Sequence, residues 1–164
     1  MRRRIAISLA LLVAASGASL AVRAALADVG EAGLVRIRGG ATTMVEGGTG
    51  APDFAPLLTK LAFHWDGERG RLECLALAPS AAAGAGQSGE FDTNVMYVTG
   101  PVTSANVNGS TAVLIGTATV TGVGAGEDVS FRLAVGRGGP GTTVVLRVSG
   151  LVFREVILEG GISF

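Results

Sequence analysis

The sequence predicts one all-β domain behind a signal peptide, folded as an antiparallel β-sandwich or a partly closed β-barrel of about seven to nine strands. Three observations predict this class. Apolar residues recur at every second position, glycine-rich segments separate these runs, and no amphipathic helix pattern occurs after residue 28. Because helices do not alternate with strands, a parallel α/β sheet is not expected.

Period-two alternation indicates strands with one face in the core and one face in solvent. Thr111–Thr121 adds a run rich in Thr, Val and Ile, which is typical of strands. The residues expected to point inward are Leu61, Phe63 and Trp65, then Val129, Phe131, Leu133 and Val135, then Val144, Leu146 and Val148.

Glycine-rich segments predict the connections between these strands. Asn108-Gly109 predicts a tight hairpin, because both residues accept positive φ. Longer connections are expected at 122–128 and 136–141, and another within 39–52. Gly160-Gly161 precedes a short apolar run that we interpret as a closing strand.

Residues 79–93 are expected to form a flexible surface loop. The Pro79–Gly89 part is rich in Ala, Ser and Gly and contains no large apolar residue.

The first 27 residues have the three parts of a secretory signal peptide. Met1–Arg4 is basic, Ile5–Val22 is uncharged and mostly apolar, and Ala25-Leu26-Ala27 is a small-x-small cleavage site. The sequence therefore predicts export to the periplasm or the cell exterior, with a mature domain of residues 28–164. The alternative is an uncleaved membrane anchor, because a run of about 18 apolar residues is near the lower limit for a membrane span.

Cleavage changes the charge of the chain from neutral to acidic. The mature domain has nine basic and thirteen acidic residues, a net charge of about −4. Nucleic acids and anionic membranes are therefore not expected as partners, because a protein needs a basic surface to bind either of them. The single cysteine, Cys74, cannot form an internal disulfide. We expect it to be buried as a small apolar residue; the alternative is a disulfide between two chains.

His64 is the only histidine, and a serine or cysteine hydrolase would need it as its base. Asp66 shares its face of the predicted strand, and Glu68 or Glu73 could lie nearby, a combination suited to metal binding or acid–base chemistry. One imidazole and one thiol are too few for a zinc site. Ser149-Gly150 and Ser104 have no nucleophile motif around them. We therefore expect no enzyme, no cofactor and no metal; the alternative is a barrel enzyme that uses His64.

Three pairs of acidic residues could be interpreted as calcium ligands, but none matches a twelve-residue calcium loop, so solvated turns are the preferred interpretation. These pairs are Asp66 with Glu68, Glu90 with Asp92, and Glu127 with Asp128.

The C-terminal part of the chain resembles the post-COAP type of domain from exported bacterial proteins. The opening hairpin of that family is matched by Phe63–Gly70 and Leu72. Later matches are Val102-Thr103-Ser104, Asn108-Gly109, Gly116–Val120 with Gly122, the Phe131 strand, Gly139–Thr142 and Gly160-Gly161-Ile162. The resemblance implies a compact exported β-domain with no assigned catalytic residues. Ala76–Gly89 departs from the family, which usually has an aromatic and an acidic residue there.

These observations predict a non-catalytic structural or interaction module that acts on a protein partner through its surface or a strand edge. The alternative is a carrier, because a closed barrel of about eight strands can hold one small apolar ligand. Its pocket mouth would then include Trp65, Phe91, Met96 and Tyr97. The carrier requires a cavity, whereas inward residues that meet across the interior leave no room for a ligand.

Overall fold

The computed structural model describes residues 35–45, 57–79 and 90–164, which form eight β-strands. No helix that is long and apolar enough to cross a membrane occurs among these residues. The strands are β1 (Ile37–Val45), β2 (Leu58–Trp65), β3 (Gly70–Pro79), β4 (Phe91–Asn108), β5 (Thr111–Gly122), β6 (Gly126–Gly136), β7 (Thr143–Val148) and β8 (Leu151–Ser163).

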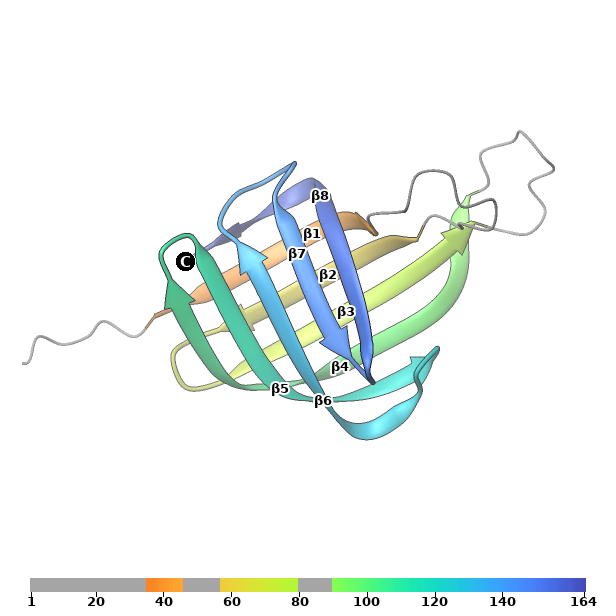
Figure 1. The fold of residues 1–164 in the computed structure, drawn as a ribbon, viewed down its shortest axis with the longest axis horizontal. Helices are drawn as coiled ribbons and strands as arrows, with labels where there is room; N and C mark the ends of the chain where they lie inside the picture. Colours follow the sequence, from red (N-terminus) through yellow and green to blue (C-terminus); the bar gives the residue numbers. More distant parts are fainter. Residues whose placement is uncertain (1–34, 46–56, 80–89) are drawn as a thin grey trace, which may run out of the picture. The chain divides into compact units, whose positions relative to one another are not determined.

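The strands form a closed antiparallel barrel in which each strand pairs with the next along the chain. In Figure 1, β5–β8 form the near wall and β1–β3 lie behind it. The barrel closes where β8 pairs with β1, with Arg38 opposite Ser163. The all-β, antiparallel class is confirmed. The sandwich and the partly closed barrel are wrong, because β8 continues through Gly160-Gly161 and pairs with β1 over most of its length.

The interior of the barrel is packed with apolar side chains from every strand, and these form one continuous cluster. The predicted alternation is confirmed on β2, β6 and β7, where the inward residues are buried except for half-buried Val129. On β5, the threonines at 117, 119 and 121 point outward and the residues between them point inward. The largest fully buried side chains are Phe131, Ile37, Leu72, Leu114, Leu133, Leu146 and Ile157.

The predicted hairpin at Asn108-Gly109 exists, with its tip one residue later. Asn108 pairs with Thr111, so Gly109 and Ser110 form the two-residue loop. Gly109 has φ +59, as expected for a glycine at the first central position of a hairpin turn. At the β7–β8 hairpin both loop residues have positive φ, Ser149 at 52 and Gly150 at 76.

Several connections are shorter than predicted. Glu127 and Asp128 belong to β6, where they lie between Gly126 and Val129, which both pair with β5. Residues 39–45 belong to β1 and pair with β2 or β8. Pro79 and residues 91–93 likewise belong to β3 and β4, although they were expected in a loop. The rest of that loop (80–89), the signal peptide (1–27) and the glycine-rich segment at 47–50 lie outside the described residues.

Neighbouring glycines on β1 provide a matched test of the packing. A Cβ at Gly39 would lie 2.2 Å from the buried Phe63 ring, whereas a Cβ at Gly40 would meet nothing within 4 Å. We expect Gly39→Ala to lower the free energy of unfolding by about 1–3 kcal/mol through overpacking. Gly40→Ala should change it by less than about 0.5 kcal/mol, since it projects into open space. Urea denaturation of both variants tests this, and equal losses would contradict the proposed packing.

Candidate functional site

The four residues predicted for a pocket mouth occupy different sides of the barrel. Trp65 points inward near the β2–β3 turn and is 8% exposed. Met96 points inward from β4, toward the opposite end, and is also buried. The next residue, Tyr97, is half-buried on the outer surface. Phe91 is half-buried at the start of β4, opposite Pro79. The structure therefore does not gather the four, and their role in ligand binding stays a prediction.

His64 lies on the outer surface of β2, in register with Arg38 on β1 and Arg71 on β3. It shares a shallow hollow of about 280 Å³ with Arg71 and Glu73. The Glu73 carboxylate accepts a hydrogen bond from Arg71 Nε at 3.0 Å, so this carboxylate already has a cationic partner. Among residues 35–45, 57–79 and 90–164, no group of three His, Cys, Asp or Glu side chains could hold a metal ion.

Asp66 stabilises the β2–β3 turn. Its Oδ1 accepts hydrogen bonds from the backbone N–H groups of Arg69, at 2.7 Å, and Glu68, at 2.9 Å. These two bonds, in that order, hold the pKa of Asp66 below its usual value. The hydrogen bonds of the turn therefore explain the position and the lowered pKa of Asp66, and no catalytic role beside His64 is needed to explain them.

Neither serine considered as a nucleophile lies near His64. Ser149 is in the β7–β8 turn, at the end of the barrel opposite the β2–β3 turn, and its Oγ donates to the Gly124 carbonyl oxygen at 2.6 Å. Ser104 is exposed on β4 and pairs with Ile115 of β5. The structure therefore brings together no Ser–His pair from these residues.

A polar cluster inside the barrel, not predicted from the sequence, consists of Thr43, Thr59 and Glu155. All three are buried, with Glu155 only 3% exposed. Thr43 donates a hydrogen bond to Glu155 Oε2, and Thr59 Oγ1 donates to Oε1 at 3.1 Å. Thr43 Oγ1 also lies 3.4 Å from the Thr59 carbonyl oxygen. The cluster thus links the inner faces of three neighbouring strands, β2, β1 and β8.

Burial favours the neutral form of Glu155. The Thr43 hydroxyl carries one hydrogen, so while it donates to Glu155 it cannot also donate to the Thr59 carbonyl oxygen. Burial raises the pKa of Glu155, and the two threonine hydroxyls offset part of that rise. No cation accompanies the carboxyl among the buried residues described.

Cys74 is buried in the same interior as a free thiol, which confirms the expectation of a small buried apolar residue. Burial raises the pKa of this thiol well above its usual range. The thiol therefore stays protonated and is a poor nucleophile.

The hollows of the barrel lie on its outer surface. The first, of about 540 Å³, spans β8, β1, β2, β3 and β4 and is lined by Lys60, Glu73, Tyr97 and Glu159, with small residues such as Gly40 and Ala62 between them. The second, of about 370 Å³, spans β5 to β8 and contains Arg132 and Arg147. Neither set of charged residues was predicted as a site, because the register that assembles it is not visible in the sequence.

Comparison with known proteins finds no match. No family model matches the chain, and no curated protein and no solved structure matches it either. The resemblance to the post-COAP type of domain therefore stays a prediction, and the function has to be argued from the barrel itself.

Replacement of Glu155 tests its protonation state. Since its folded pKa is raised, the folded state holds the proton more tightly than the unfolded state, and its contribution to stability is lost as pH rises through the folded pKa. Gln mimics the neutral acid, so Glu155→Gln should match the wild type in acid and become the more stable protein as pH rises. Denaturation midpoints across pH measure this difference.

Glu159→Gln, an exposed position on the same strand, is the control and should show no such divergence. A wild type that gains stability over Glu155→Gln with rising pH would show instead that the barrel favours the ionised carboxylate.

Proposed function

We propose that the domain is an exported, non-catalytic interaction module that binds its partner on the outer surface of the barrel. The observation that carries this proposal is the filled interior: buried apolar side chains from all eight strands form one continuous cluster. A carrier needs a pocket of roughly 300 Å³ or more. Large inward side chains that pack against one another leave no room for a ligand. Three of them, Phe131, Leu133 and Leu146, are each at most 2% exposed.

Closure of the barrel narrows how such a module can bind. Each of the eight described strands pairs with two neighbours, so none of them has an edge that is free along its whole length. Only short stretches, such as Phe91–Asn94 of β4 on the side of β5, remain for β-strand addition. The outer faces remain, and they carry the hollows of about 540 and 370 Å³. Export is supported by the signal-peptide pattern of residues 1–27.

Within the described part of the barrel, the buried Glu155 cluster is the feature that favours a carrier, because ligand pockets combine apolar walls with a few polar groups. Both carboxyl oxygens of Glu155, however, are hydrogen-bonded to threonines of the barrel itself. The cluster therefore satisfies its own hydrogen bonds without a ligand, which favours the module over the carrier.

An apolar probe tests whether the interior is filled. We expect benzene, titrated and followed by methyl NMR, to leave the wild-type interior unchanged. Leu133→Ala is the positive control: it should lose about 2–5 kcal/mol of stability and open a dry apolar cavity able to bind such a probe.

Native mass spectrometry of protein from the exporting host should give the mass of a chain that begins at Asp28. A retained apolar molecule would overturn the proposal.

Photo-crosslinking tests the outer surface. A photoreactive residue at Tyr97, in the first hollow, or at Ile115, in the second, should form an adduct of one defined mass in the exporting host. Thr119 is the control, because it is exposed on β5 and lines neither hollow. Adducts of equal yield at all three positions, or at none, would contradict a specific outer binding surface.

A further inference from the structure

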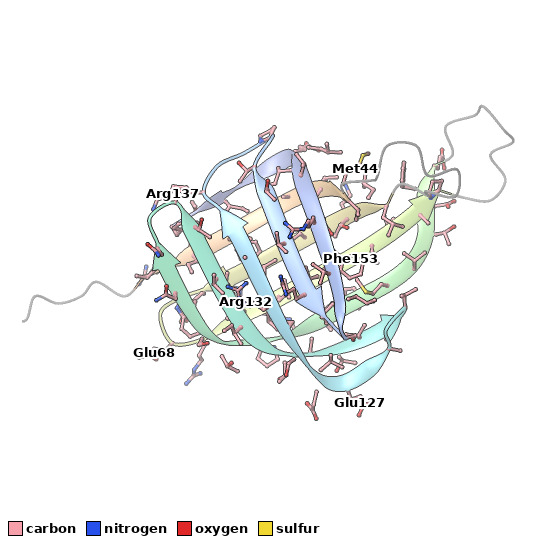
Figure 2. The ribbon with its side chains drawn as sticks, viewed as in Figure 1. Met44, Glu68, Glu127, Arg132, Arg137 and Phe153 are labelled. Atoms are coloured by element: carbon pink, nitrogen blue, oxygen red, sulfur yellow. The ribbon has the colours of Figure 1, made fainter. Side chains whose placement is uncertain are left out.

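Three arginines lie together on the outer wall formed by β6, β7 and β8. Arg132 on β6 is directly opposite Arg147 on β7, and Arg147 is directly opposite Val152 on β8. Arg154 follows two positions after Val152 and therefore points to the same side. All three side chains are exposed, and Figure 2 shows Arg132 on the middle of this wall.

This cluster has no carboxylate partner in the described part of the chain, where the ion pair is Arg71–Glu73 on β3. Figure 2 shows the labelled Glu68 and Glu127 near the ends of the barrel, away from Arg132. The other outward positions around the arginines are neutral: Val113, Ile115, Ser130, Ala134, Thr143, Val145, Val152 and Val156. A local concentration of positive charge thus exists on a domain that is acidic as a whole.

The Arg132–Arg147 pair opposes the stability of the sheet. Directly opposite residues have Cβ atoms about 5 Å apart, and like charges in that position are destabilising. A local conflict of this kind, without a partner to relieve it, is expected where a residue serves function and not folding. An anion held between the two guanidinium groups would remove the conflict.

The space beside the two arginines has the size and lining for a small organic molecule. A hollow of about 370 Å³ is lined by Ile115, Ser130, Arg132, Arg147 and Val152, with Phe131, Val148, Gly150 and Leu151 at its base and end. Ile115 and Val152, in the same cross-strand row as the arginines, are 45% and 50% exposed. The row therefore presents two cations flanked on both sides by apolar surface.

We propose that this hollow binds a small organic oxyanion, a phosphate monoester or a carboxylate, whose short apolar part packs on Ile115 and Val152. The planar guanidinium group donates two parallel hydrogen bonds to such oxygens, and a pair of them can hold one anion from two sides. Arg154 adds positive charge at the edge of the site. This inference rests on the proposed function, since it names the ligand of one outer face.

The small number of arginines in the cluster argues against a polyanion as its ligand. Nucleic acids and anionic membranes are held by many basic residues spread over an extended surface. Here three arginines occupy one part of one wall, and two exposed aliphatic side chains, Ile115 on β5 and Val152 on β8, flank the Arg pair in the same row. A single charged group joined to an apolar chain fits this arrangement better.

Titration with octyl phosphate, followed by methyl NMR at low salt, tests the site. We expect saturable shifts at Ile115 and Val152, with weaker binding of inorganic phosphate and none of the uncharged octyl glucoside. Arg147→Gln should weaken octyl phosphate binding about tenfold or more, as expected for loss of a charge-assisted hydrogen bond. Arg38→Gln, the same change at an exposed arginine on β1, should leave the affinity unchanged.

Thermal stability gives a second, independent measurement. Without ligand, Arg147→Gln should melt at the same temperature as the wild type or higher, because it removes a repulsion. Octyl phosphate should raise the melting temperature of the wild type and of Arg38→Gln, but not of Arg147→Gln.

Three outcomes would overturn the site: equal binding of octyl glucoside, equal affinity for inorganic phosphate alone, or equal loss of affinity in Arg38→Gln. If these occur while crosslinking at Tyr97 succeeds, the outer-surface module stands and only the oxyanion site fails. Uptake of benzene by the wild-type interior would instead contradict the proposed function.

Discussion

The pairing of β1 with β8 is the constraint on which the rest of the structure depends. Without it the eight strands would be an open sheet with two free edges and an exposed apolar face. The seam requires close approach of the two backbones: a Cβ at Gly160, where φ is +92, would lie 2.1 Å from the Gly40 carbonyl oxygen. Closure seals the apolar face into a single core and leaves only the outer walls in contact with solvent.

The two sides of the barrel wall therefore follow different chemical rules. Inside, any polar group has to find its partners within the barrel, and Glu155 does so with two threonines from β1 and β2. Outside, water satisfies polar groups, so charges can be placed at a much smaller cost to folding. Arg132 and Arg147, which have no carboxylate partner among the described residues, are possible only there, where high dielectric limits the cost of placing one opposite the other.

The local parts of this fold could be predicted from the sequence, and the long-range parts could not. Alternation identifies the strands because each residue's face depends only on its neighbours in the chain. The same alternation could have indicated that Glu155 points inward, because it lies between Phe153 and Ile157 on β8 and shares their face. The Arg132–Arg147 pair needs the register of two strands joined by a six-residue connection, 137–142, which sequence alone does not fix.

The seam also sets the order of folding. Most pairings join strands that are consecutive in the chain, but Arg38 meets Ser163 only after nearly the whole domain has been synthesised. Contacts of such long sequence separation form slowly, because a large loop has to close first. Until then the unpaired sides of β1 and β8 are two complementary edges. At high concentration, β8 of one molecule can complete β1 of another, so strand exchange is the misassembly that we expect of this barrel.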